Sequence, residues 1–334
     1  MNEDGLVAGY SWSLDEPSHA FLWDSDGGQR DLGTLGGTYS QATDINDNGE
    51  TVGWSNTLLG ATHAFLWDSV NGMQDLGTLG TEFSSASDMN NAGQVVGQSS
   101  TSSGDSHAFL WDGTSGMRDL GTLGGLASSA TAVNEAGQVA GVSTTDAGEE
   151  HAFVWDSATG MQDLGTLGGA FSEATGINDN GQVIGQSLTD RGSLHPFIWD
   201  STRGMQDLGS LGGFEAFAYD VNNNGQVVGK AKTDFDYWHA FIWDATNGLQ
   251  DLGALGGFLS SSGVAINEAG QVAGTADEQV FLWDATEGFQ MGRDGVAVDL
   301  NDAGQVAGCF YIGRIVWFIL ITGYSEPHVF VWED

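Results

Sequence analysis

The chain has 334 residues, of which 45 are acidic and 8 are basic, and its formal net charge is −37. A field of this sign repels nucleic acid and anionic membrane surfaces, so neither is expected as a partner. Apolar residues make up 40% of the chain and aromatic residues 10%, which excludes a disordered polypeptide.

This acidic composition is typical of secreted or halophilic proteins, and we expect stability to rise with salt because screening weakens self-repulsion.

Cys309 is the only cysteine, which excludes an intramolecular disulfide and a cysteine metal cluster. The longest strongly apolar run, 315–321, has seven residues and is too short to span a bilayer. Residues 1–14 lack the features of a signal peptide and begin midway through a repeated unit, so we expect a mature form or a fragment.

From the N-terminus onward, three motifs recur in a fixed order with a period of about 44 residues. They are of the types HAFLWD, DLGTLGG and IN-x-x-GQVVG. A period in the forties built of short strands is typical of β-propeller blades. We therefore predict one repeat domain, 1–334, with units at approximately 1–39, 40–83, 84–127, 128–171, 172–215, 216–259, 260–293 and 294–334.

Turn chemistry places four strands in each unit, as the second unit illustrates. Asn46 and Gly49 suit the first and fourth positions of a type I turn, which predicts a hairpin between strand a (40–46) and strand b (50–55). A second hairpin joins strand c (63–68) to strand d (73–77). The four strands are predicted to form a meander.

Two features favour a propeller. Strand c is apolar on both faces, because Phe65 and Trp67 point one way while Ala64 and Leu66 point the other, and the blades of a propeller cover both faces of one another. Strand a carries a small residue four before its Asn, as expected where blades converge on an axis: Ala42, Ala86, Ala130, Ala174, Ala218, Gly263 and Ala297.

The predicted fold class is therefore all-β, a β-propeller of four-stranded blades. Strands b and c each occur eight times, which favours eight blades, with seven as the alternative because both ends are incomplete. An open solenoid, which also buries both faces of each unit, is the alternative architecture. Residues 309–324 depart from the period, and since 323–325 resemble 9–11 we expect a damaged reading frame or an added strand there rather than a membrane anchor.

Three patterns suggest sites but have plainer interpretations. The seven histidines occupy the same position in their repeats: His19, His63, His107, His151, His195, His239 and His328. With one histidine in each blade, these side chains cannot converge on one metal ion. A structural contact or a hydrogen bond to a carbonyl is therefore expected. Residues 44–49 and 220–225 match the opening of a calcium loop, but its later carboxylate ligands are missing, so we expect a hydrogen-bonded turn. The TLGG tracts, as at 34–37, lack the lysine of a P-loop and are interpreted as connectors between blades. No cofactor is expected, and calcium is the alternative.

The loops between strands b and c vary most among the units: 56–62, 100–106, 144–150, 188–194 and 231–238. In a meander these loops share one end with the connections from strand d to the next strand a, so a partner is expected to bind at that end. Phe235, Tyr237 and Trp238 are the candidate ligand-binding residues, because aromatic side chains beside acids stack on sugar rings or anchor protein partners. Packing at the edge of the blade is the structural alternative.

The motifs resemble the HAF-repeat family of extracellular repeat proteins, named for the His-Ala-Phe found here at 19–21, 63–65, 107–109, 151–153 and 239–241. The resemblance covers nearly the whole chain, with departures such as Pro196 in place of the Ala. It implies an extracellular or cell-surface location and transfers no catalytic residue. A fainter similarity to WD40 propellers lies in the Trp-Asp of strand c and supports the fold only.

High internal symmetry, with variation confined to one set of loops, favours a non-enzymatic extracellular or cell-surface monomer that presents those loops to a protein or glycan ligand. The first alternative is a polysaccharide hydrolase or lyase, for which the inner acids Asp44, Asp88, Asp220 and Asp299 are the candidates, although capping of the adjacent turn explains them as well. No catalytic residue is singled out. A calcium-stabilised structural module is the second alternative.

Overall fold

The computed structural model describes residues 1–11, 17–80, 82–254, 259–312, 315–321 and 328–329. These residues fall into two compact units, Met1–Asp163 and Leu164–Asp334, and each unit is described by itself. In the described part of the chain every regular element is a β-strand. The prediction of an all-β protein is confirmed.

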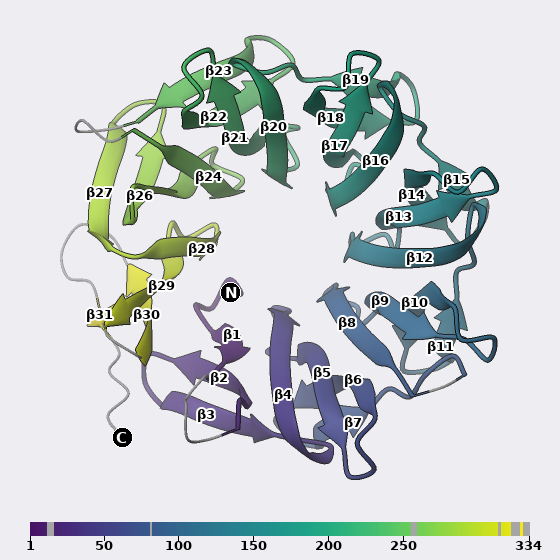
Figure 1. The fold of residues 1–334 in the computed structure, drawn as a ribbon. Coiled ribbons are helices and arrows are strands. Elements are labelled where there is room, and N and C mark those ends of the chain that lie inside the picture. The colour runs from purple at the N-terminus through teal and green to yellow at the C-terminus, as the bar shows by residue number, and fades with distance from the viewer. Residues whose placement is uncertain (12–16, 81, 255–258, 313–314, 322–327, 330–334) are drawn as a thin grey trace. The chain divides into compact units, whose positions relative to one another are not determined.

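The basic element is an antiparallel meander, which Figure 1 shows most plainly for β4, β5, β6 and β7. These strands span Gly36–Ile45, Thr51–Thr57, Thr62–Asp68 and Gly72–Asp75, and both predicted hairpins are present in them. At the ab turn, 46–49, Gly49 donates its N–H to the Asn46 carbonyl at 3.0 Å and has a φ of 75°. This type I turn followed by a left-handed residue is a common hairpin connection, and it requires glycine at its last position.

The remaining strands of the first unit repeat this order. The copies of strand a are β8 and β12, and those of strand b are β1, β9 and β13. The copies of strand c are β2, β10 and β14, and those of strand d are β3, β11 and β15. Their bounds are β1 Val7–Tyr10, β2 Ala20–Asp24, β3 Gly28–Gly33, β8 Ser84–Met89, β9 Val95–Ser100, β10 Ser106–Asp112, β11 Gly116–Asp119, β12 Gly124–Val133, β13 Val139–Thr145, β14 Glu150–Asp156 and β15 Gly160–Asp163.

The second unit continues the pattern, starting again with strand a. Its strands are β16 Gly168–Ile177, β17 Val183–Thr189, β18 Leu194–Asp200, β19 Gly204–Asp207, β20 Gly212–Val221, β21 Val227–Thr233, β22 Trp238–Asp244, β23 Gly248–Gly253, β24 Ser261–Ile266, β25 Val272–Ala276, β26 Gln279–Asp284, β27 Gly288–Asp294, β28 Val296–Leu300, β29 Val306–Ile312, β30 Ile315–Ile321 and β31 His328–Val329.

Strand a differs from its prediction in length and regularity. In β4, β12, β16 and β20 it begins four residues earlier than expected, because the first of the two glycines that close the DLGTLGG-type tract already pairs with strand b. In β4 the pairing shifts register between Ala42 and Asp44, which is a β-bulge at the inner end of the strand. The same shift recurs in the other copies that carry strand a.

The core is built where successive meanders pack face to face. Phe65, Phe109, Phe153, Phe197, Phe241 and Phe281, all on strand c, are fully buried. Ala64 and Leu66 of one repeat lie in the same apolar cluster as Phe109 of the next repeat. Equivalent clusters join Ala108 and Leu110 to Phe153, and Ala240 and Ile242 to Phe281. The prediction that both faces of strand c are covered by neighbouring repeats is confirmed within each unit.

The glycine in the middle of strand b is required by this packing. A Cβ atom on Gly53 would overlap the Gln41 carbonyl oxygen and lie 2.9 Å from the Cα of Ala42, on the bulged strand a. On Gly141 it would also lie 2.8 Å from the ring of Phe153. Bulge, glycine and phenylalanine therefore form one interlocking arrangement in each repeat.

The two ends of the chain differ from each other. Near the N-terminus β1, β2 and β3 form a three-stranded sheet among the described residues. Near the C-terminus β28, β29, β30 and β31 form a four-stranded sheet, and its third strand, β30, lies within the stretch 309–324 that departs from the period. The described residues contain no helix with the length and hydropathy needed to cross a bilayer. The predicted strand c residues 330–332 lie outside the described residues.

Candidate functional site

The Asn of each ab turn links one repeat to the next. Asn90 Nδ2 donates to the Asn134 carbonyl at 3.0 Å, while its Oδ1 accepts the backbone N–H of Gln94 at 3.0 Å. The same bond to the next repeat joins Asn2 to Asn46, Asn46 to Asn90, Asn178 to Asn222, Asn222 to Asn267, and Asn267 to Asn301. These side chains are buried. Sequence reasoning assigned the Asn to its own turn only and missed this second role.

The inner acids have a similar structural role. Asp44 Oδ2 accepts the backbone N–H of Met89 at 2.9 Å, Asp88 Oδ2 accepts that of Val133 at 2.7 Å, and Asp220 Oδ2 accepts that of Ile266 at 2.8 Å. Each bond reaches the next repeat. Asp220 and Asp299 each also accept the backbone N–H of the following residue, Val221 and Leu300, at 2.8 Å.

Desolvation sets the acidity of these carboxyls. Burial raises the pKa of Asp44 despite a hydrogen bond between its carboxyl and that of Asp88. Burial and the nearby Asp44 charge raise the pKa of Asp88 well above its usual value. Burial also raises the pKa of Asp220 to about 6. A raised pKa suits a general acid, but the bonds to the next repeat account for these residues without a reaction.

The histidine register is a set of pairs with acids on strand d. His63 Nδ1 lies 2.9 Å from both carboxylate oxygens of Asp75, and the same pair recurs at His107 and Asp119. Equivalent pairs are His19 with Asp31, His151 with Asp163, His195 with Asp207 and His239 with Asp251. The expected structural role fits, but the partner is a carboxylate on the adjacent strand and not a carbonyl. His328 is outside this comparison, because only the backbone is described there.

The side-chain oxygen atoms of the calcium-like turn accept hydrogen bonds within the turn and from neighbouring repeats. Asn46 Oδ1 accepts the N–H groups of Asn48 and Glu50, and Asp44 is engaged with the next repeat. In the TLGG tract the Thr34 hydroxyl donates to the Gly37 carbonyl at 2.9 Å, which fixes the connector. No cluster of three or more His, Cys, Asp or Glu side chains with metal-binding geometry occurs in the described part of the chain.

The bc turns share one geometry and differ at their tips. In each, a Thr carbonyl accepts the N–H of the residue three positions later, as in Thr57 to Gly60 at 3.0 Å. These turns span 57–61, 101–105, 145–149, 189–193 and 233–237. Gly36 pairs with Thr57, so the connector to strand a lies beside the bc turn, as expected for a meander. We call this side of each repeat the bc end.

Exposed large apolar side chains concentrate at the bc end. Leu58, Leu59 and Phe235 at turn tips are 80%, 95% and 82% exposed. Leu126 and Phe214, in the adjoining first residues of strand a, are 72% and 80% exposed. The bc end therefore combines sequence variation with apolar exposure.

The three candidate aromatic residues occupy different positions in one repeat. Phe235 stands at the tip of the bc turn and Tyr237 at its base, 41% exposed. Trp238 begins β22 and is half-buried, with its ring centroid 5.6 Å from that of Phe217 on β20. Two lysines on β21 lie over the Trp238 ring, with Lys230 Nζ at 4.8 Å and Lys232 Nζ at 5.2 Å from its centroid. Trp238 therefore packs against the sheet, while Phe235 and Tyr237 face solvent.

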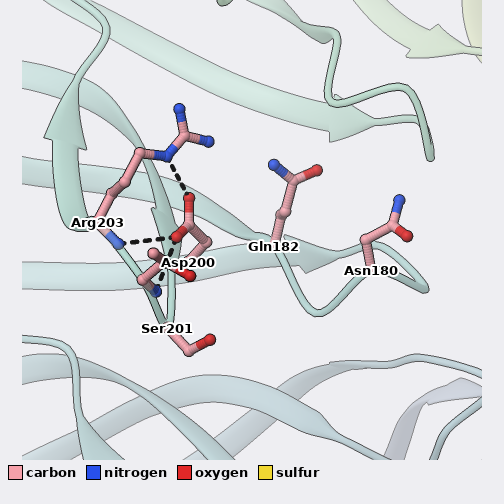
Figure 2. Close-up of a pocket in the computed structure, with 6 residues that line it drawn as sticks. Asn180, Gln182, Asp200, Ser201 and Arg203 are labelled. Atoms are coloured by element: carbon pink, nitrogen blue, oxygen red, sulfur yellow. Dashed lines mark hydrogen bonds and ion pairs between the residues drawn. The ribbon is translucent and has the colours of Figure 1, made fainter.

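An open depression lies at the opposite end of the fifth repeat, between an ab turn and a cd turn. It is lined by Asn180 and Gln182 from the ab turn and by residues 200–203 from the cd turn. Figure 2 shows Arg203 folded back on Asp200, where Arg203 Nε lies 2.7 Å from Asp200 Oδ2. Since its charged groups are paired with each other, the depression offers little to hold a ligand.

Face-to-face packing of antiparallel meanders in sequence order defines an all-β, propeller-like class of protein. Residues 31–196 match the family model described as "Protein of unknown function (DUF3466)". No curated protein sequence matches the chain at a significant level.

Solved structures agree on the fold. The β-propeller domain of the Trilobed protease from Pyrococcus furiosus, described as having an open velcro topology, is similar with a TM-score of 0.56 and 10% identity over 87% of this chain and 95% of that one. An acylaminoacyl peptidase from Pyrococcus horikoshii (TM-score 0.52, 11% identity, 87% of this chain and 52% of that one) is also similar. So is a puromycin-hydrolyzing peptidase from Mycobacterium tuberculosis (TM-score 0.51, 11% identity, 95% and 58%). At these identities the likeness concerns the fold alone.

Proposed function

We propose that this chain is a non-enzymatic binding protein, extracellular or on the cell surface and of the HAF-repeat type, that holds a protein or glycan ligand at its bc ends. In this proposal the eight repeats are four-stranded blades of a propeller. The observation that carries the proposal is the concentration of exposed apolar side chains at the bc end, where the turns also vary most.

The rigid framework supports this assignment. Buried phenylalanines, asparagine bonds and histidine–aspartate pairs recur in almost every repeat and fix the backbone of each meander. The turn tips take no part in these contacts, and their backbone is closed by local hydrogen bonds of the Thr residue. Binding residues on short turns of a rigid scaffold are a general arrangement in repeat proteins.

The alternatives receive less support. The acids proposed for a hydrolase or lyase bond backbone N–H groups, in the next repeat for Asp44, Asp88 and Asp220. The oxygen atoms proposed for calcium accept hydrogen bonds within the turn at Asn46 and from the next repeat at Asp44. Neither observation points to a reaction or to an ion.

The test exchanges turn tips among repeats that share one geometry. In one variant Leu58, Leu59, Asp234 and Phe235 become Ser, as at the natural tip Ser102–Ser103, and in the control variant the exposed Val70 of a cd turn becomes Ser. Both proteins are screened on a glycan array and by pull-down with a crosslinker. We expect the tip variant to lose the ligand that the parent and control retain. Equal retention by all three proteins, or turnover of a polysaccharide without binding at the tips, would refute the proposal.

A further inference from the structure

One sheet, which contains β20, β21 and β22, departs from the symmetry of the repeats in its charged and aromatic side chains. It holds Lys230 and Lys232, the only lysines of the chain. Lys230 Nζ lies 5.5 Å from the ring centroid of Phe217, 5.6 Å from that of Tyr219 and 4.8 Å from that of Trp238. In the second repeat the positions of Phe217 and Lys230 are occupied by Gln41 and Trp54. The base of this bc end is therefore a packed layer of rings and ammonium groups.

A strained residue marks the turn above this layer. Asp236 has a φ of 65°, in the left-handed region that non-glycine residues adopt rarely. The four matching turns place Gly60, Gly104, Gly148 and Gly192 at this position. Left-handed non-glycine residues cluster at functional sites, where the surrounding structure holds them. Here the turn keeps a carboxylate where the other repeats have none.

Lys232 fixes that carboxylate together with a second one. Its Nζ lies 2.9 Å from Glu215 Oε2 and 3.0 Å from Asp236 Oδ1. These two hydrogen bonds, that to Glu215 the stronger, raise the pKa of Lys232. Each carboxylate uses one oxygen in this contact and has a second oxygen that can accept a hydrogen bond, and both contact the same ammonium group.

Exposed aromatic residues are next to these carboxylates in the sequence. Phe235 and Tyr237 adjoin Asp236 in the turn, and Phe214 adjoins Glu215 in strand β20. Because Gly212 pairs with Thr233, the beginning of β20 lies beside the bc turn. Phe214 and Phe235 are 80% and 82% exposed. No other bc turn of the described chain has aromatic residues both in the turn and in the adjoining first residues of strand a.

We propose that Phe214, Phe235 and Tyr237, with the carboxylates of Glu215 and Asp236, form a binding site for a neutral saccharide. The rings would stack on the C–H faces of one or two sugar rings, and the carboxylates would accept hydrogen bonds from sugar hydroxyls. This inference rests on the proposed function and adds to it the place and the chemical class of the ligand.

Charge and size favour this ligand over others. The two lysines are outnumbered by Glu215, Asp234 and Asp236, and the chain carries a net charge of −37, so an acidic saccharide would be repelled. A stable protein–protein interface buries about 1,600 Å² in total, with roughly 20–30 residues on each side. Three exposed rings on one sheet match one or two sugar units far better than such an interface.

The experiment measures binding of cellohexaose, xylohexaose, chitohexaose and mannohexaose to the full chain by isothermal titration calorimetry, with hexagalacturonate as the charged comparison. Phe235→Ala removes a ring, and Asp236→Gly removes the carboxylate while restoring the residue that four other turns use, so this variant should fold. Val70→Ala is the matched control, because Val70 is 88% exposed and lies in a cd turn, away from the bc end.

We expect at least one neutral hexasaccharide to bind, Phe235→Ala to weaken that binding at least about tenfold, and Asp236→Gly to weaken it about threefold or more. Val70→Ala should leave it unchanged. Absence of binding to every neutral probe, stronger binding of hexagalacturonate, or equal losses in Val70→Ala and Phe235→Ala would overturn the proposal. If a protein partner is captured through Phe235 while no sugar binds, the saccharide assignment is wrong and the proposed binding function stands.

Discussion

At the scale of single residues, the ab-turn asparagine carries more of the structure than its turn requires. Its carbonyl accepts the turn hydrogen bond, its Oδ1 accepts backbone N–H groups, and its Nδ2 donates to the next repeat. An amide is suited to this position because it is a donor on one side and an acceptor on the other.

The isosteric change Asn90→Asp tests this role. The variant replaces a buried donor by an acceptor that faces the Asn134 carbonyl and Gln94 Oε1, so repulsion and an unpaired carbonyl should lower the free energy of unfolding by about 3 kcal/mol or more. Urea unfolding followed by tryptophan fluorescence measures the loss. Asn48→Ala is the control, because Ala92 and Ala136 fill this turn position in other repeats. Equal stability of the two variants would show that the bonds to the next repeat contribute little.

Asp220 gives the structure a pH dependence of known sign. Desolvation raises its folded-state pKa to about 6 from 3.8, so between these values the folded state holds a proton that the unfolded state has released. Stability from this group is therefore present at low pH and lost as pH rises through 6, by up to about 3 kcal/mol.

The measurement compares urea unfolding of the parent and of Asp220→Asn from pH 4 to pH 7.5. The free energy of unfolding of the parent should fall relative to that of the variant across this range. Asp244→Asn is a control of opposite sign, because hydrogen bonds from Asn247 lower the pKa of Asp244 and its stabilisation is lost as pH falls. Parallel curves for the parent and Asp220→Asn would contradict the raised pKa.

At the scale of elements, the turn residues in the sequence were sufficient to predict the hairpins but not the contacts between repeats. The Asn46–Gly49 pattern predicted a hairpin because both turn partners lie within four residues. The Asn90–Asn134 bond could not be predicted in the same way, because the two residues are 44 positions apart and belong to different sheets. The early start of β4 was missed because glycines are rare inside strands, and only the neighbouring strand explains them.

Strand c of one repeat is hydrogen-bonded to strand a of the next repeat through a serine, and in one repeat both partners of this bond are replaced. The Ser128 hydroxyl accepts the backbone N–H of Ala108 at 2.8 Å and donates to the Gly121 carbonyl at 2.6 Å. In one repeat the alanine is replaced by Pro196, which has no N–H, and the serine at the matching distance along the chain is replaced by Ala216. Donor and acceptor are lost together.

Restoring the two groups separately tests this coupling. Pro196→Ala should expose a buried N–H without a partner and lower the free energy of unfolding by about 1–2 kcal/mol. Adding Ala216→Ser to that variant should recover most of the loss. Thermal unfolding of both single variants and the double variant provides the double-mutant cycle. Additive effects would mean that the two departures are unrelated.

At the scale of the whole chain, charge should control stability through the solvent. A net charge of −37 produces self-repulsion that salt screens, with a Debye length of roughly 8 Å at physiological ionic strength. We expect the midpoint of thermal unfolding to rise steadily as sodium chloride increases from millimolar to molar concentration. Calorimetry with sucrose at matched water activity controls for solvent effects other than screening, and a midpoint that is flat or falls with salt would contradict this expectation.

The central claim is that each repeat is stable only because Phe and Trp side chains of its strand c pack against the neighbouring sheet. The most direct test expresses residues 84–127 as an isolated repeat and records its amide NMR spectrum beside that of the full chain. The account predicts a collapsed, poorly dispersed spectrum for the single repeat and a dispersed one for the full chain. A dispersed spectrum with cooperative unfolding for 84–127 alone would contradict it.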